Sequence, residues 1–153
     1  MKRILIALCF CATVISVMLN FVPQPFCKVA ERFPKDATAT VFCRKTSCPS
    51  TNVGNGFLVE CTVQNLLPTL SQCEQVDGVS VKFNCSKLCF HQVVNQFNLQ
   101  NESRLVLNGV QVVCGYSAKV QGCVVIDGQK INVQIACDGQ TVTVGSPLIL
   151  DSF

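Results

Sequence analysis

Apolar and polar side chains alternate along several segments of this chain, a period of two residues that is typical of β-strands with one buried face. The alternation is clearest over residues 57–64, 79–85 and 131–137. The apolar phase of each segment includes a cysteine. Its members are Phe57, Val59, Cys61 and Val63 in the first, Val79, Val81, Phe83 and Cys85 in the second, and Ile131, Val133, Ile135 and Cys137 in the third. These cysteines should therefore face the core.

Turn signals separate the alternating segments. Asn-Gly and Asp-Gly pairs tolerate the positive φ values that tight hairpin turns require. The chain contains Asn55-Gly56, Asp77-Gly78, Asn108-Gly109, Asp127-Gly128 and Asp138-Gly139. The strongest hairpin signal spans residues 105–114, where Asn108-Gly109 joins two aliphatic runs, and a last strand is expected over 141–144.

These patterns predict an all-β fold, an antiparallel, disulfide-rich sandwich or small barrel of about seven to nine strands. Helix should be minor. The one helical candidate is residues 87–97, where Val93, Val94 and Phe97 form an approximate helical stripe. The chain has no Trp and lacks the cysteine layout of an immunoglobulin domain, so that family is not expected.

Residues 55–85 and 108–137 share an order of motifs. Each runs Asn-Gly, four residues, Cys, then a second Cys, three residues, Asp-Gly and a final Cys. The gap before the final cysteine differs by two residues, which keeps the same strand face inward. This internal repeat favours one closed domain of two duplicated halves. The alternative is that turn dipeptides fall near cysteines by chance.

The start of the chain has the features of an export signal. Lys2-Arg3 precedes an uncharged run from residue 4 to residue 27. We predict a signal peptide over 1–22 and a single cysteine-rich domain over 27–153, hence a secreted protein without membrane contact after cleavage. The alternative is an uncleaved signal anchor, because the run is long enough to cross a bilayer. Both place the domain outside the cytoplasm.

Composition narrows the function classes further. The 153 residues are 49% hydrophobic and 14% charged, which excludes intrinsic disorder and suits one packed domain. Removal of Lys2 and Arg3 reduces the 12 basic residues to 10, against 9 acidic ones. The domain is then nearly neutral and has no basic cluster, so we expect no nucleic-acid partner.

Ten of the 12 cysteines lie beyond the predicted signal peptide, an even number that suits a fully paired framework. They are Cys27, Cys43, Cys48, Cys61, Cys73, Cys85, Cys89, Cys114, Cys123 and Cys137. Outside the cytoplasm such a set should form disulfide bonds, each stabilising the fold by about 2–4 kcal/mol. Their connectivity stays open, because ten cysteines allow about 945 pairings.

Catalytic and metal sites have little support in the sequence. Cys43-x4-Cys48 and Cys85-x3-Cys89 could hold zinc, but neither is the tight C-x2-C pair and both would oxidise outside the cell. His91 follows Cys89 by two residues, yet a bridged cysteine cannot act as a nucleophile. No phosphate loop or hydrolase elbow occurs. We therefore expect no catalysis, no metal and no cofactor.

Two N-glycosylation sequons occur, at Asn84-Cys85-Ser86 and Asn101-Glu102-Ser103. The second lies in a stretch, 95–104, that we expect to be a polar loop. In the first, a bridge at Cys85 would compete with glycan transfer.

These observations favour an extracellular binding module that recognises a protein or glycan partner without catalysis. One alternative is a secreted toxin, inhibitor or effector that acts through the loop 43–61, where Arg44 and Lys45 would present a basic tip to an acidic pocket. The other is a structural coat or matrix component assembled through sheet edges, which would form concentration-dependent polymers.

Overall fold

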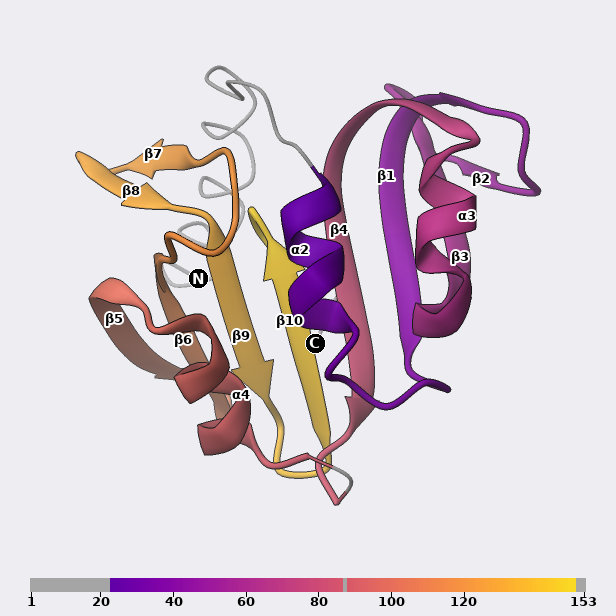
Figure 1. The fold of residues 1–153 in the computed structure, drawn as a ribbon. Coiled ribbons are helices and arrows are strands. Elements are labelled where there is room, and N and C mark those ends of the chain that lie inside the picture. The colour runs from indigo at the N-terminus through magenta and orange to yellow at the C-terminus, as the bar shows by residue number, and fades with distance from the viewer. Residues whose placement is uncertain (1–22, 87, 151–153) are drawn as a thin grey trace.

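A computed structural model describes residues 23–86 and 88–150 (Figure 1). The predicted signal peptide, 1–22, lies outside the described residues. One antiparallel sheet has the strand order β2-β3-β1-β4-β10-β9-β6-β5, and β7 and β8 form a separate pair. The strands are β1 (Thr38–Thr46), β2 (Thr51–Asn52), β3 (Phe57–Thr62), β4 (Cys73–Asn84), β5 (Gln100–Leu107), β6 (Val110–Tyr116), β7 (Val124–Ile126), β8 (Gln129–Ile131), β9 (Val133–Cys137) and β10 (Thr141–Ser146).

The predicted all-β class is confirmed: the described part of the chain is 50% strand and 18% helix, with a large antiparallel sheet. The layer that packs on this sheet is helical (Figure 1). It contains α2 (Pro23–Ala30), the short 3-10 turn η2 (Val63–Asn65) followed by α3 (Leu66–Leu70), and α4 (Phe90–Phe97). The expected helix over 87–97 is thus α4. None of the described helices is both long and apolar enough to span a membrane.

The main core lies between the helices and the sheet. In α2, Phe26, Val29 and Ala30 follow the i, i+3, i+4 spacing of one helix face, and all three are buried. The Phe26 ring stacks on Phe97 of α4, with their centroids 6.4 Å apart. Phe33, just after α2, packs on Phe83 of β4 at 5.2 Å. These rings join α2 and α4 across the sheet.

Residues 23–26, which the sequence analysis assigned to neither the signal peptide nor the domain, form the start of α2, and Phe26 is fully buried. Pro23 and Pro25 fit the first turn of a helix, where the backbone N–H needs no partner.

A second, smaller apolar cluster lies on the other face of the sheet. Val112 and Val113 are neighbours on β6, yet Val113 belongs to the main core and Val112 to the second cluster, because side chains alternate between faces. The buried members of the second cluster are Val112, Cys114, Val124, Ile131 and Ala136. The C-terminal segment covers part of it through Leu148 and Ile149.

A buried polar network fastens the loop after β6 to the start of β9. The Asn132 side chain donates to the carbonyls of Ser117 (2.9 Å) and Val120 (2.8 Å) and accepts from the Ser117 N–H (2.7 Å). Asn132 and Ser117 are fully buried. Ser146 of β10 donates its hydroxyl to the Asn132 carbonyl at 2.9 Å.

Most of the predicted turns are confirmed. Asn108-Gly109 and Asp127-Gly128 have positive φ at both positions, as a type I′ turn requires. Asp138 accepts hydrogen bonds from the backbone N–H groups of residues 140 and 141 at 2.8 and 2.7 Å, so it holds the β9–β10 turn. Asn55-Gly56 lies between β2 and β3, where the Val53 N–H donates to the Gly56 carbonyl.

The predicted turn at Asp77-Gly78 is wrong, because both residues lie inside β4. Asp77 instead pairs with Arg44, whose Nε lies 2.6 Å from its carboxylate. A Cβ on Gly78 would come within 3.3 Å of the Leu150 side chain and 3.4 Å of the Ser146 carbonyl. Glycine here permits the close approach of the C-terminal segment, which is a role of strand glycines.

The two segments of the sequence repeat occupy different strand orders. In 55–85, β3 and β4 are separated by β1, whereas in 108–137 the strands β6 and β9 pair directly. The strands of the two segments are therefore arranged differently in the sheet, and the internal duplication stays a prediction from the sequence motifs.

Candidate functional site

The most exposed part of the sheet is its β5 edge. All eight residues of β5 are exposed, and the strand pairs only with β6. Leu105, Val106 and Leu107 are 40%, 68% and 45% exposed. An edge strand presents unpaired backbone N–H and C=O groups, and natural proteins usually protect such strands with charge, proline or a short length. The aliphatic end of β5 lacks these protections.

The register shows how this aliphatic end relates to the rest of the sheet. Leu105 and Leu107 pair with Val112 and Val110 of β6, so they lie on the face of the second apolar cluster and extend it to the edge. Val106 pairs with the exposed Gln111 and lies on the opposite face. The edge therefore offers aliphatic side chains on both faces.

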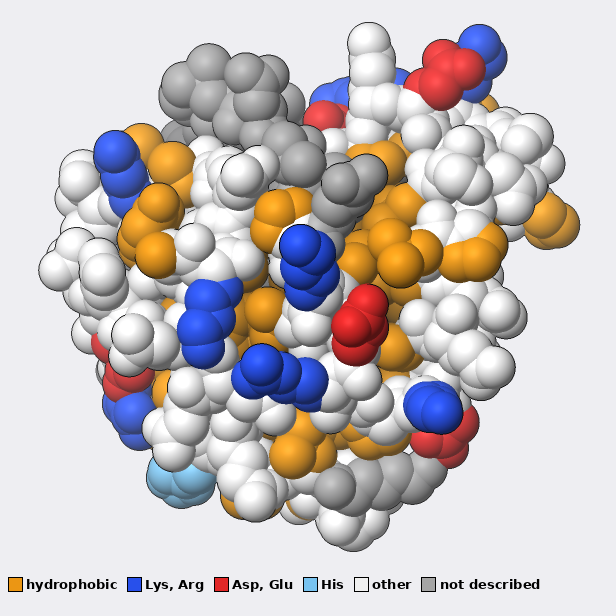
Figure 2. Space-filling view, in the orientation of Figure 1, with side chains coloured by type: hydrophobic (Ala, Val, Ile, Leu, Met, Phe, Trp, Pro, Cys, Tyr) orange, Lys and Arg blue, Asp and Glu red, His pale blue; other side chains and the backbone are white. Residues whose placement is uncertain are grey.

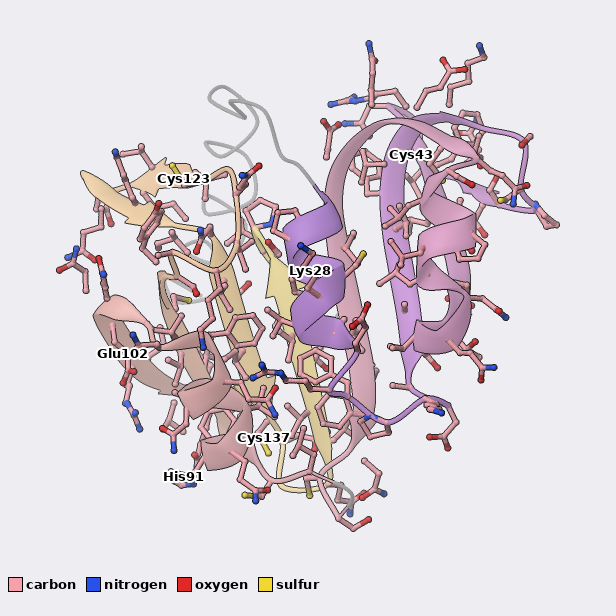
Figure 3. All side chains as sticks on the ribbon, in the orientation of Figure 1. Lys28, Cys43, His91, Glu102, Cys123 and Cys137 are labelled. Atoms are coloured by element: carbon pink, nitrogen blue, oxygen red, sulfur yellow. The ribbon has the colours of Figure 1, made fainter. Side chains whose placement is uncertain are left out.

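The other end of β5 is polar and irregular. Asn101 has φ of 51°, and the register with β6 shifts between Gln100 and Ser103. Glu102 forms an ion pair with Arg104 along the strand, and it lies at the outer edge of the molecule in Figure 3. The second sequon, expected in a polar loop, thus lies on an edge strand, and its Asn101 is exposed.

The first sequon lies at the end of β4. Asn84 is exposed, but its side-chain oxygen accepts a hydrogen bond from the Ser86 N–H at 2.9 Å, and the next residue, Cys85, is half-buried.

Arg44 and Lys45 lie at the end of β1 rather than on a loop tip. Besides its pair with Asp77, Arg44 donates to the Asn55 carbonyl at 2.7 Å, and its guanidinium lies 5.4 Å from the centre of the Phe42 ring. Lys45 contacts Glu74 at 3.2 Å. Both charges thus have an acidic partner within the domain.

Five cysteines gather beside the main core in the N-terminal half of the chain. They are Cys27, Cys43, Cys48, Cys61 and Cys73, which we call the N-terminal thiol group. Burial raises the pKa of the Cys27 thiol to about 11, and Glu31 and Cys61 add to the rise. Burial raises the pKa of Cys61 too, with a contribution from Cys48 and Cys73. The thiols of this group therefore influence one another's pKa values.

Within this group, the Cys73 thiol influences the pKa of Cys43. Burial raises the pKa of Cys43 to about 12, and a hydrogen bond with the Cys73 thiol is the next cause. Cys73 Sγ also lies 3.5 Å from Thr46 Oγ1.

The other five cysteines lie elsewhere among the described residues. Cys85 Sγ lies 3.2 Å from the Gly139 carbonyl oxygen, and the Gly139 N–H donates to Cys137 Sγ at 3.4 Å. Cys114 lies in the second cluster, where burial raises its pKa to about 11. Cys123 precedes β7, far from Cys43 and Cys137 in Figure 3.

All ten cysteines among the described residues are free thiols in the structure, so the predicted bridges stay a prediction. No group of three or more His, Cys, Asp or Glu side chains in the described ranges has metal-binding geometry.

The Cys89 and His91 pair lies at the start of α4. Cys89 is the N-cap residue: its thiol accepts from the N3 backbone and the Gln92 side chain bonds back to its N–H, which forms a capping box. His91 is exposed and its ring lies edge-on to Phe90, with 5.9 Å between the ring centres.

A shallow cleft of about 340 Å³ lies between α2 and the η2–α3 segment. It is lined mainly by apolar side chains, including Phe33, Val63 and Leu67, with Glu31 and Lys35 among the polar ones. Figure 2 shows hydrophobic side chains gathered on this helical face of the molecule. Sequence reasoning missed this cleft because α2 and α3 were not predicted.

No protein-family model, no curated protein and no solved structure matches this chain.

Proposed function

We propose that the protein is a secreted, disulfide-stabilised binding module that captures an extended segment of an extracellular protein along β5. The observation that carries this proposal is the exposure of all eight residues of the edge strand, three of them consecutive aliphatic residues. An extended peptide added to a sheet edge gains backbone hydrogen bonds from the edge and specificity from alternate side chains.

The chemistry of the edge favours a protein over a glycan. Leu105 and Leu107 would lie against alternate apolar residues of an added strand, while Val106 would contact it on the opposite face. Glu102 and Arg104 could pair with charged residues of the same strand and fix its register.

The two edges of the sheet differ, which bears on the coat or matrix alternative. Open polymers need a heterologous contact, here β5 of one copy on β2 of the next. β2 has only two residues, Thr51 and Asn52, so it offers a poor ladder to an eight-residue strand. Pairing of β5 with β5 of a second copy would close at a dimer. We therefore favour a partner protein over a growing assembly.

The toxin or inhibitor alternative has less support from the geometry. Its basic tip was expected to reach an acidic pocket, yet Arg44 and Lys45 each contact a carboxylate of the same domain. A free acidic pocket would have to displace those pairs.

The proposal is tested by pull-down from extracellular fluid with the oxidised protein, comparing the wild type with Val106→Lys. A lysine on the edge opposes strand addition. Val125→Lys is the matched control, because Val125 is an exposed valine, at 48%, on the separate β7–β8 hairpin. A photo-reactive amino acid at position 106 identifies any polypeptide that lies against the edge.

We expect the wild type and the Val125 variant to retain the same polypeptide, cross-linked from position 106. The Val106 variant should lose at least tenfold in affinity, since an apolar contact of this size contributes about 1.5–3 kcal/mol. Equal binding by all three proteins would contradict the proposal. Retention of glycans alone would favour the glycan alternative.

A further inference from the structure

We propose that two copies of this protein pair through β5 as a twofold-symmetric dimer, in which Val106 of one copy lies opposite Val106 of the other. This inference concerns the edge that carries the proposed function, and it rests on the same freedom of that edge to add a strand. The second copy covers the edge until a partner segment replaces it, so the dimer regulates capture.

The hairpin geometry decides which backbone groups of β5 point away from the sheet. Asn108-Gly109 forms a two-residue type I′ turn, so Leu107 and Val110 are the hydrogen-bonded pair beside it. Hydrogen-bonded and non-hydrogen-bonded pairs alternate along an antiparallel ladder, and the register with β6 is unbroken over the last five residues of β5. The N–H and C=O groups of Val106 and Arg104 therefore point to the open edge.

A second copy of β5 must present outward-facing backbone groups too, which leaves three antiparallel registers. Arg104 opposite Arg104 places like charges directly across the pair, which is unfavourable. Arg104 opposite Val106 places Leu107 opposite the polar Ser103. Val106 opposite Val106 places Leu105 opposite Leu107 on both sides of the axis. This last register brings the apolar side chains together and keeps the arginines apart.

The favoured register joins the apolar side chains of the two copies. Leu105 and Leu107 lie on the face of the second cluster, and directly opposite side chains of neighbouring strands share a face. The leucines of the two copies therefore meet and extend the second cluster from one copy to the next. On the other face, the two Val106 side chains meet at the axis. Pairing thus covers three of the six large hydrophobic side chains that are exposed in the described part of the chain.

This dimer is closed. A twofold contact uses β5 of both copies, and the opposite edge of each sheet is β2, which has only two residues. β5 lies at the left margin of the molecule in Figure 1, so a second copy can approach it from outside. A contact of a few residues per copy is smaller than a standard protein–protein interface, and we expect reversible pairing.

Sedimentation equilibrium of the oxidised, purified protein tests the dimer. The wild type is compared with Val106→Lys, Val106→Glu and Val125→Lys over about a hundredfold range of protein concentration. Val125→Lys is the matched control, because Val125 is an exposed valine on the separate β7–β8 hairpin. In the favoured register, each change at position 106 places two like charges opposite each other. A mixture of the Lys and Glu variants places opposite charges there.

We expect the wild type and the Val125 variant to reach twice the monomer mass and no more. Each Val106 variant alone should associate at least about tenfold more weakly, and their equimolar mixture should form the dimer again. Self-association of Val106→Glu alone would place this residue opposite Arg104 and overturn the register. A wild type that is monomeric throughout would overturn the dimer, while capture of a polypeptide by that monomer leaves the proposed function intact. A monomer that captures nothing would overturn both.

Cross-linking gives a second measurement that leaves the charge of the edge unchanged. A photo-reactive amino acid replaces Val106 in a mixture of isotope-labelled and unlabelled copies, and the linked protein is reduced and digested with trypsin. Cleavage after Arg104 separates residues 88–104 from residues 105–119. The favoured register predicts a link between a labelled and an unlabelled 105–119 peptide. A link from 105–119 into 88–104 of the other copy would contradict it.

Discussion

Replacement of Asn132 by Ala should destabilise the domain more than any change on its surface. The side chain makes three hydrogen bonds, to the N–H and carbonyl of Ser117 and to the carbonyl of Val120. All three residues are at most 2% exposed, so the truncation leaves the Ser117 N–H and the Val120 carbonyl buried without this partner, while the Ser117 carbonyl keeps its hydrogen bond from the Val120 N–H. Each unpaired buried group costs about 1–3 kcal/mol. The variant no longer has to desolvate the Asn132 side-chain amide on folding, and this saving offsets part of that cost. We expect a loss of about 4 kcal/mol.

The free energy of unfolding can be measured by urea denaturation of the oxidised protein. The chain has no Trp and one Tyr, so far-ultraviolet circular dichroism is the suitable signal. With a urea dependence of about 1.5 kcal/mol per molar, a loss of 4 kcal/mol lowers the midpoint by about 2.5 M. Asn132→Leu fills the space but cannot donate or accept, so it should be no more stable than the alanine variant.

Asn95→Ala is the matched control. Asn95 is exposed on α4, where alanine has a better helix propensity, so its stability should change by less than about 0.5 kcal/mol. A loss below about 1 kcal/mol for Asn132→Ala would refute the role of the network, because the Ser117 N–H and the Val120 carbonyl would then have found other partners at no cost.

Three further outcomes follow. In the reduced protein, the raised pKa of Cys114 (about 11) stabilises the fold below pH 9, and titration to pH 11 should remove up to ~3 kcal/mol; a Cys114→Ala variant with the same pH profile would contradict this. Gly145→Ala places a Cβ against the backbone of the C-terminal segment and should cost at least about 2 kcal/mol in thermal unfolding. Secretion from a eukaryotic host should add one glycan at Asn101, which Asn101→Gln removes by mass.

Local patterns predicted the elements whose signal is contained in a few neighbouring residues. The β5–β6 hairpin depends on Asn108-Gly109, which adopts the expected positive φ angles. The inward phase of Val79, Val81 and Phe83 was also correct, because a strand on a buried core must alternate.

Other features depend on contacts that are distant in sequence. Gly78 permits the close approach of Leu150 to β4, and Asp77 is paired with a residue 33 positions away. Neither contact is visible in the local sequence, where the Asp-Gly pair resembles a turn. The edge position of β5 also follows from the order of the strands, and the first half of β5 lies in the stretch 95–104, which was predicted to be a loop. The candidate binding edge was consequently absent from the sequence prediction.

The pairing of β4 with β10 joins the two halves of the sheet. β1 and β10 both pair with β4, and the β4–β10 ladder from Asn84–Thr141 to Val79–Ser146 is the one strand pairing between the two halves of the described sheet. Tension applied between α2 and a partner on β5 must therefore cross this ladder, supported by the Phe26–Phe97 contact above it.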